Sequence, residues 1–380
     1  MYNKKDSRYI SFVTFFSAML FAAVFFLMLT YSNAVSNGIG IGISICVETV
    51  IPSLFVFMVL ASFLSFSPIS KVISIPLAPI TKYIFGLSSE FGCAILMSMI
   101  GGYPVGAKSI DQLYRTKQIS SKQASFMLCF CCNPSPAFVI AGVGTAMLGN
   151  TRAGVVIYLS SIISSLVIGL LVKKNIKSTD IVRRQGDTLS FSSSIVSAMR
   201  NATSAIIIMC GFVLFFCSVI EIIRYLDVVS WLCNTLKLGT NTSQIVSSCV
   251  YGFLEVTGGC IECVKYSDFT RIILLPFFTS FAGLSVIFQI IAMFEDNDEI
   301  SFLPFISSRF LHGIITVILS YPFLSKLLIA TSVFSINSKP IPVANSNTPI
   351  FIICILCMCY MIFSGGNRIF LKKTYKSTKI

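Results

Sequence analysis

Charged residues are scarce in this chain of 380 residues: Asp, Glu, Lys and Arg make up 11% of it, and it has one histidine. A soluble domain usually carries about 25% charged residues, so an ordinary cytosolic enzyme and a disordered protein are both excluded. The net charge of +13 does not indicate a nucleic-acid partner, because no basic face on a soluble fold accompanies it. Apolar side chains take the place of charge, since 55% of the residues are hydrophobic and the mean hydropathy is +0.86.

This composition predicts an all-α polytopic membrane protein that lies in the lipid bilayer. The 34 phenylalanines and 23 glycines fit lipid-facing helices that pack closely through small residues. A transmembrane helix needs about 20 apolar residues. By that rule we expect about eight transmembrane helices, near 10–30, 47–66, 122–148, 153–172, 202–224, 270–294, 307–329 and 350–366.

Lysines and arginines gather in three clusters, at 4–8, 173–184 and 368–379. Cytoplasmic loops carry such an excess of positive charge, so we expect both termini and the central loop to be cytoplasmic. The first apolar run, 10–30, is longer than the 7–15 residues or so of a signal-peptide core. We therefore interpret it as a retained first transmembrane helix.

Two further apolar stretches, 91–112 and 245–266, are each interrupted by a glycine pair and by polar residues. Broken segments of this kind are tolerated in a membrane only when they are buried in protein or line a cavity. The stretches that precede them, 67–90 and 225–242, mix charged with apolar residues. Amphipathic helices at the membrane interface are the form that we expect for these two stretches.

The two broken segments belong to an internal repeat. The motif GGYPVGAK at 101–108 aligns with GGCIECVK at 258–265, at an offset of 157 residues. The charged residues matched at this offset are Lys108 with Lys265, Asp111 with Asp268, and Arg152 with Arg309. An odd number of crossings in each half makes the repeats inverted. The predicted layout is a first helix in 1–40, repeat one in 41–172, a cytoplasmic linker in 173–190, repeat two in 191–330, and a last helix with a basic tail in 331–380.

Inverted repeats with broken helices are typical of secondary transporters, whose substrate lies where the breaks approach each other. Helix N-termini at the breaks would offer free N–H groups, and glycine lets the backbone approach a ligand closely. The predicted substrate-binding residues in the two motifs are Gly101, Gly102, Pro104, Gly106, Lys108, Gly258, Gly259 and Lys265. The two lysines would attract an anion, or they would extend to headgroups at the interface. For Asp111 and Asp268, three residues further on, the role that we favour is pairing with these two lysines.

Four polar residues inside apolar runs complete the predicted site. Glu255 lies three residues before Gly258, and an intramembrane carboxylate is a candidate functional group by default; the alternative is a structural bond to the broken backbone. Asn133 and Ser135 lie in the motif CNPSP, whose prolines free backbone carbonyls. Gln289 lies at nearly the equivalent place in repeat two. Asn133 and Gln289 would suit a polar planar ligand, or they would join helices by hydrogen bonds.

We expect neither an enzyme nor a cofactor. The sequence shows no nucleophile–base pair, no metal ligand set and no P-loop. The CxxC spacing of Cys260 and Cys263 has no second pair to complete a metal site. We interpret most of the 14 cysteines as small apolar fillers.

At three motifs the chain resembles the family of the sporulation integral membrane protein YlbJ. They are GGYPVGAK at 101–108, CNPSPAF at 132–138 and GFLEVTGG at 252–259, and the resemblance covers roughly 40–330. It implies a place among the nucleoside-recognition, or Gate, domain proteins. It also implies a role in endospore formation, in moving dipicolinate from the mother cell across the outer forespore membrane. Other sporulation membrane proteins would then be candidate partners.

Dipicolinate, a small planar dianion, fits the pattern of the residues. Two opposed helix N-termini with Lys108 and Lys265 would suit its two carboxylates. On this hypothesis, replacing both lysines with Met abolishes dipicolinate loading. A Gate-type carrier of nucleosides or cations, and a structural sporulation protein that transports nothing, are the alternatives.

Overall fold

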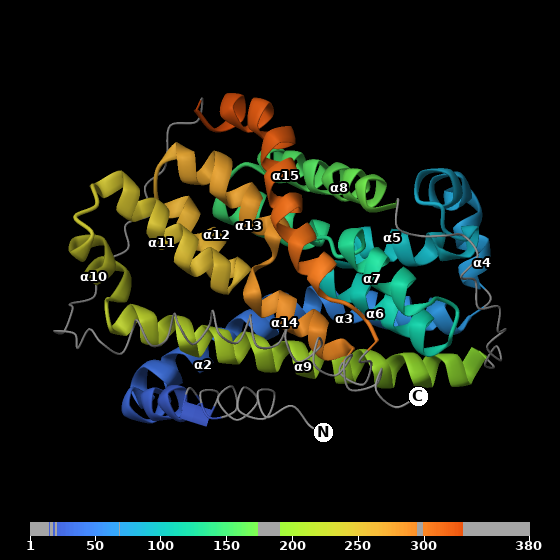
Figure 1. The fold of residues 1–380 in the computed structure, drawn as a ribbon, viewed down its shortest axis with the longest axis horizontal. Coiled ribbons are helices and arrows are strands. Elements are labelled where there is room, and N and C mark those ends of the chain that lie inside the picture. The colour runs from blue at the N-terminus through green and yellow to red at the C-terminus, as the bar shows by residue number, and fades with distance from the viewer. Residues whose placement is uncertain are drawn as a thin grey trace, which may run out of the picture.

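The computed structural model describes residues 15, 18–19, 21–67, 69–173, 191–294 and 299–329. Every regular element in these ranges is a helix, which confirms the predicted all-α class (Figure 1). The main α-helices are α2 (Ser32–Ile45), α3 (Ile51–Phe66), α4 (Ile69–Ser74), α5 (Gly92–Gly101), α6 (Tyr103–Arg115), α7 (Ser121–Phe130), α8 (Thr151–Val172), α9 (Phe191–Tyr225), α10 (Val228–Thr235), α11 (Thr240–Leu254), α12 (Val256–Lys265), α13 (Leu275–Phe281), α14 (Gly283–Met293) and α15 (Leu303–Ile329). π-helices are η1 (Cys46–Val50), η3 (Ile80–Ile84), η5 (Ala137–Met147) and η7 (Thr270–Leu274), and 3-10 helices are η2 (Ile75–Leu77) and η4 (Ser89–Phe91).

Four helical stretches in the described ranges are long and apolar enough to cross a membrane: Thr151–Val172, Phe191–Tyr225, Thr270–Met293 and Leu303–Leu328. Each coincides with a predicted span. Two further pairs of helices pass the same test but bend sharply, by 92° and 102°, which raises the number to at most six. The membrane class is therefore confirmed, while the described ranges hold fewer spans than the eight predicted. The run 350–366 lies outside the described residues.

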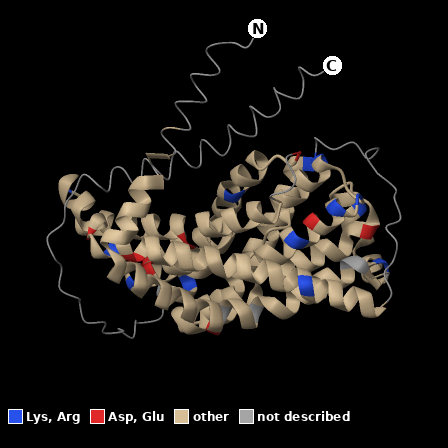
Figure 2. Cartoon of the chain, turned by 90° about the horizontal axis from the view of Figure 1, so that it is seen from below, with Lys and Arg blue, Asp and Glu red and all other residues tan. Residues whose placement is uncertain are grey.

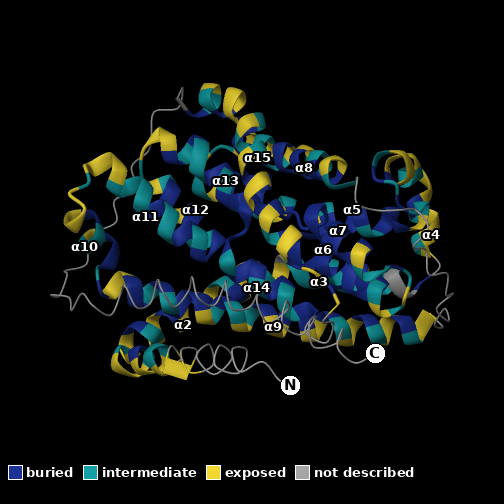
Figure 3. Cartoon of the chain, viewed as in Figure 1, coloured by how far each residue is buried: buried dark blue, intermediate teal, exposed yellow. Residues whose placement is uncertain are grey.

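The surface of the described chain is apolar, as a lipid-facing surface requires. Figure 2 shows that charged residues are sparse along the described helices. Large side chains such as Phe26, Leu303 and Ile318 are mostly exposed, and Figure 3 shows exposed residues along the outer helices around a buried centre. The long helix α9 packs against α2, α3 and α14 and so joins the two halves of the chain.

The first broken segment is a hairpin of two short helices, α5 and α6. At a rise of 1.5 Å per residue, the ten residues of α5 reach only about half of a hydrocarbon core of about 30 Å. The chain reverses at Gly102, whose φ of 95° is a conformation that side chains other than glycine rarely adopt. Pro104 then stands in the first turn of α6, where its missing N–H costs no bond. This segment is therefore a hairpin and not one continuous span.

The second broken segment, α11 with α12, is also a hairpin, and it turns at Glu255 in extended conformation. The predicted register is wrong at this break. Gly258 and Gly259 lie inside the first turn of α12, whereas Gly101 and Gly102 end α5 and form the turn. The helix after the turn begins at Val256, 153 residues after Tyr103 and not 157.

Two longer segments are broken as well. The predicted span 122–148 consists of α7 and η5, separated at the CNPSP motif by residues 131–136. Its counterpart in the second half breaks between α13 and α14 at Ala282, whose φ is 81°. Each half thus holds one hairpin, one broken helix and one long final helix.

The stretches predicted as interfacial helices form short helices. Residues 67–90 contain α4, η2, η3 and η4, and residues 225–242 contain α10. Val72, Ile75 and Tyr83 are exposed on the first stretch, which is consistent with a position against lipid headgroups.

Close contact at Gly106 generates the first prediction. A Cβ atom there would lie 1.8 Å from the carbonyl oxygen of Cys131 and 2.8 Å from Ser98 Cβ, so Gly106→Ala forces α6 away from both its hairpin partner and the broken helix. Overpacking of this kind costs about 1–3 kcal/mol, and we expect a clear fall in the melting temperature of the detergent-solubilised protein. The control is Gly211→Ala on α9, where nothing lies within 4 Å of the new Cβ. Equal melting temperatures for the two variants would contradict the packing at Gly106.

Candidate functional site: a cavity at four helix N-termini

The tips of the two hairpins meet at one cavity of about 80 Å³. Residues from both halves of the chain line it. Its lining residues are Ile45, Val50, Leu54, Gly102, Tyr103, Pro104, Ser135, Phe138, Val213, Glu255, Val256, Thr257, Val286 and Gln289. Segments far apart in the sequence therefore share one site, and both breaks of each half contribute to it.

Four helices begin at this cavity. α6 begins at Tyr103, η5 at Ala137, α12 at Val256 and α14 at Gly283, and each places residues of its first two turns, or of its cap, in the lining. The first N–H groups of a helix have no partner within it, and its N-terminus carries about half a positive charge. No lysine or arginine is among the lining residues. The helix starts are therefore the source of positive partial charge at the cavity, and Glu255 adds a carboxylate to its lining.

Glu255 is the carboxylate among these lining residues. Its side chain is nearly buried, at 5% exposed. The N–H of Gly258 donates to its Oε2 at 2.7 Å, so Glu255 caps the start of α12. Oε2 of Glu255 therefore makes the structural bond to the broken backbone that was one of the two interpretations of this residue. Glu255 also lines the cavity, so a functional role stays a prediction.

Ser135 and Gln289 also line the cavity, but Asn133 does not. Ser135 Oγ accepts the N–H of Phe138 at 3.2 Å and so caps η5. Gln289 Nε2 donates to Ser285 Oγ at 3.2 Å, within α14. The Asn133 side chain is fully buried and donates to the carbonyl of Phe130. Of Asn133 and Gln289, which would together suit a polar planar ligand, only Gln289 therefore borders the cavity.

The predicted glycines divide between the cavity and helix packing. Gly102 lines the cavity together with Pro104. Gly101 and Gly106 lie against Val105 and the Cys131 carbonyl, and a Cβ on Gly259 would lie 2.2 Å from Gly252 Cα. Gly258 contributes its N–H to Glu255. The predicted glycines other than Gly102 therefore serve backbone packing and capping and do not border the cavity.

The structure does not bring Lys108 or Lys265 to the cavity. Lys108 pairs with Asp111 at 3.0 Å, and the fully buried Asp111 also accepts from Arg115 at 2.7 Å. This agrees with the pairing that we favoured in the first repeat. Lys265 instead pairs with Glu262 at 3.0 Å. Its expected partner Asp268 lies 3.6 Å from Arg271, so that prediction is wrong. The physical reason is that α12 ends at Lys265, which leaves Asp268 outside the helix, whereas Asp111 lies on the same helix as Lys108.

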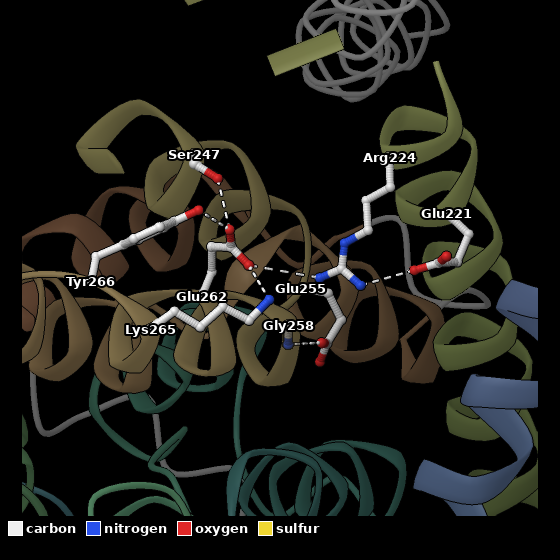
Figure 4. Close-up of polar contacts among 8 residues, drawn as sticks. All are labelled: Glu221, Arg224, Ser247, Glu255, Gly258, Glu262, Lys265 and Tyr266. Carbon is white, nitrogen blue, oxygen red and sulfur yellow. Dashed lines mark hydrogen bonds and ion pairs between the residues drawn. The ribbon is translucent and has the colours of Figure 1, made fainter. Parts of the chain in front are cut away.

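Glu262 is the centre of a cluster that sequence reasoning missed (Figure 4). It accepts from Ser247 at 2.9 Å, from Tyr266 at 2.6 Å and from Lys265 at 3.0 Å. Arg224, on α9, lies 3.9 Å from it and also pairs with Glu221. The cluster therefore ties the second hairpin to α9. Both Glu262 and Arg224 are charges within apolar runs, a signal that could have identified them.

Tyr103 is a second residue that the sequence did not single out. Its side chain is buried at the tip of the first hairpin, and its hydroxyl donates to the carbonyl of Thr279 on α13. The first hairpin is thereby fastened to the broken helix of the other half. Its place between a glycine pair and a proline marked a chain break, but nothing in the sequence indicated its partner.

Burial predicts unequal effects for the two members of the Glu262–Lys265 pair. Glu262→Ala leaves the Ser247 and Tyr266 hydroxyls without their acceptor, and a buried donor left without a partner costs about 1–3 kcal/mol. The Lys265 side chain is 48% exposed, and an exposed ion pair contributes about 0–1 kcal/mol. We expect Glu262→Ala to lower the melting temperature in detergent much more than Lys265→Met does. A larger effect of the lysine variant would show that the cluster does not depend on Glu262.

Similarity to a known protein extends over most of the chain. No family model matches the chain, and no solved structure matches it, so the Gate-domain relationship remains a prediction. The chain is 24% identical over 328 residues to the sporulation integral membrane protein YlbJ of Bacillus subtilis (strain 168), covering 78% of this chain and 80% of that protein. This match over most of both chains confirms the resemblance to the YlbJ family that the three motifs predicted.

Proposed function

We propose that the protein is a sporulation membrane transporter that moves a small organic anion, dipicolinate, across the outer forespore membrane. The observation that carries the proposal is the convergence of four helix N-termini on one cavity between the two halves of the chain. The name of the similar B. subtilis protein supports the sporulation membrane as the setting.

The chemistry of the cavity favours an anion. Unpaired N–H groups and positive dipole ends at helix N-termini stabilise negative charge, and phosphate, sulfate and carboxylate all bind there. The side chains of Ser135 and Gln289 add polar groups to an otherwise largely apolar lining. A planar dicarboxylate would place its carboxylates at opposed helix starts and its ring against Phe138 and Val286.

Glu255 gives the site a means of release. Its carboxylate already occupies the start of α12 through the N–H of Gly258. An anion that reaches this helix start competes with Glu255 for the same donors, and the two negative charges repel each other. Binding is thereby kept weak enough for the anion to leave again.

Transport also requires the hairpin tips to move. Pockets for drug-sized ligands have volumes of about 300–1,000 Å³, whereas this cavity has about 80 Å³. The tips at Gly102 and Glu255 must therefore separate to admit a dicarboxylate. Short helices that end at a cavity are suited to such movement, because the long helices around them stay in place.

The direct test is uptake by lipid vesicles that contain the purified protein. We expect uptake of labelled dipicolinate and none of labelled nucleosides. Uptake of nucleosides alone would favour the Gate-type nucleoside carrier. Absence of any uptake, with spores that still need the protein, would favour the structural alternative.

Gln289 generates a prediction for this assay. Gln289→Leu keeps the size of the side chain but removes a hydrogen-bonding group from the cavity. One lost hydrogen bond of about 1.4 kcal/mol lowers the rate of dipicolinate uptake about tenfold. The matched control is Gln244→Leu on α11, which is not among the lining residues. If both variants transport like the original protein, Gln289 does not meet the substrate.

The two lysines generate a second prediction, opposite to the one made from the sequence. Because neither Lys108 nor Lys265 lines the cavity, the double variant with both replaced by Met should retain most dipicolinate uptake in vesicles. Dipicolinate content of spores that carry the variant gives the same comparison in cells. Complete loss of uptake by a stably folded double variant would show that the two lysines contact the substrate during transport.

A further inference from the structure

Arg309 is a fully buried cation inside a membrane-spanning helix, α15. Its guanidinium donates to the main-chain carbonyls of Cys129 and Cys132. These carbonyls belong to the end of α7 and to the break that follows it. Within the described ranges no carboxylate pairs with Arg309.

Other side chains add donors at the same helix end. Ser308 Oγ donates to the Cys129 carbonyl at 3.1 Å, in addition to Arg309. Asn133 Nδ2 donates to the Phe130 carbonyl at 3.0 Å. The C-terminus of a helix carries about half a negative charge. The partner of the Arg309 guanidinium is therefore the end of α7, in the place of a carboxylate.

The orientation of Arg309 is held by its neighbours on two helices. Its guanidinium lies 5.2 Å from the centre of the Phe305 ring and 3.2 Å from His312 Nδ1. His312 Nε2 in turn lies 2.9 Å from the carbonyl oxygen of Ser161 on α8. The charge is therefore held in place by α8 and α15 together.

Two more helix ends are closed in the same manner. The Tyr103 hydroxyl donates to the Thr279 carbonyl at the end of α13, and the Tyr158 hydroxyl donates to the Met99 carbonyl near the end of α5 at 2.9 Å. In transporters built from broken helices, such carbonyl-bearing ends coordinate the coupling sodium ion. Here the protein's own side chains occupy them.

We propose that Arg309 is a tethered counter-cation that takes the position of a coupling sodium ion at this break. A cation that is part of the chain cannot dissociate, so no sodium gradient is used there. Anion movement through the cavity is then independent of sodium. The transport part of this inference rests on the proposed function, whereas occupation of the α7 end by Arg309 does not.

Ion replacement in the unmodified protein tests the proposal. We expect the same rate of dipicolinate uptake into vesicles in sodium chloride and in choline chloride. In detergent, titration of sodium chloride against choline chloride at constant ionic strength should leave the melting temperature unchanged. Sodium-dependent uptake, or a saturable rise of the melting temperature with sodium, would overturn the proposal. If no dipicolinate enters in any salt, the proposed function fails, and the melting-temperature titration still decides the role of Arg309.

Removal of the tethered charge tests it from the other side. Arg309→Ala should lose dipicolinate uptake and melt at a lower temperature, and added guanidinium ion at a non-denaturing concentration should raise that melting temperature. Arg152→Ala, at the exposed start of α8, is the matched control. It should keep dipicolinate uptake and its melting temperature, and added guanidinium ion should not raise that temperature. If Arg309→Ala melts and transports as the unmodified protein does, the counter-cation is not needed. If the variant does not fold, the sodium titration of the unmodified protein decides the role of Arg309.

Discussion

Backbone polar groups that are freed inside a membrane must find partners within the protein, because hydrocarbon offers none. The two hairpins and the two broken helices of the described part interrupt helical structure at Gly102, at residues 131–136, at Glu255 and at Ala282. Each interruption leaves N–H groups on one side and carbonyls on the other. The arrangement of many polar side chains in the centre of the molecule follows from satisfying these groups.

The two kinds of helix end are treated differently. The carbonyl-bearing ends of α7, α13 and α5 are bonded by donors from other elements, namely Arg309, Tyr103 and Tyr158. N-terminal ends are capped in part, by Glu255 and Ser135, and they face the cavity. Three carbonyl-bearing ends are thus compensated, while residues at the starts of helices line one small cavity. This asymmetry is the physical basis for the proposal that the site binds an anion.

Charge outside the cavity serves to position the hairpins. Asp111 is held within α6 by Lys108 and Arg115, while Glu262 joins α12 to Arg224 on α9. Asp111 is thus paired within its own helix, whereas Glu262 is paired both with Lys265 of its own helix and with α9. The second hairpin is therefore attached to α9 by charge, whereas the first is attached to the other half through Tyr103.

Much of the architecture was predictable from the residues themselves. Long apolar runs defined α8, α9 and α15, and glycine and proline marked the breaks at Gly102 and in the CNPSP motif, because local backbone geometry requires those residues there. The break at Ala282, inside the predicted span 270–294, was not predicted. Glu255, Ser135, Gln289, Gly102 and Pro104 were each identified as site residues from polarity or conformation, and all of them line the cavity.

The placement of the charges was decided only by the tertiary structure. Lys108 and Lys265 stand beside glycine pairs in the sequence, yet helical periodicity and buried partners direct them to Asp111 and Glu262. In the sequence, Arg309 was noted only because it aligns with Arg152 in the internal repeat. Its role could not be predicted, because its partners are carbonyls about 177 to 180 residues away along the chain. Composition and chain breaks are local properties that a sequence states directly. Which helix end meets which side chain depends on how the two halves pack, and only the folded chain determines that.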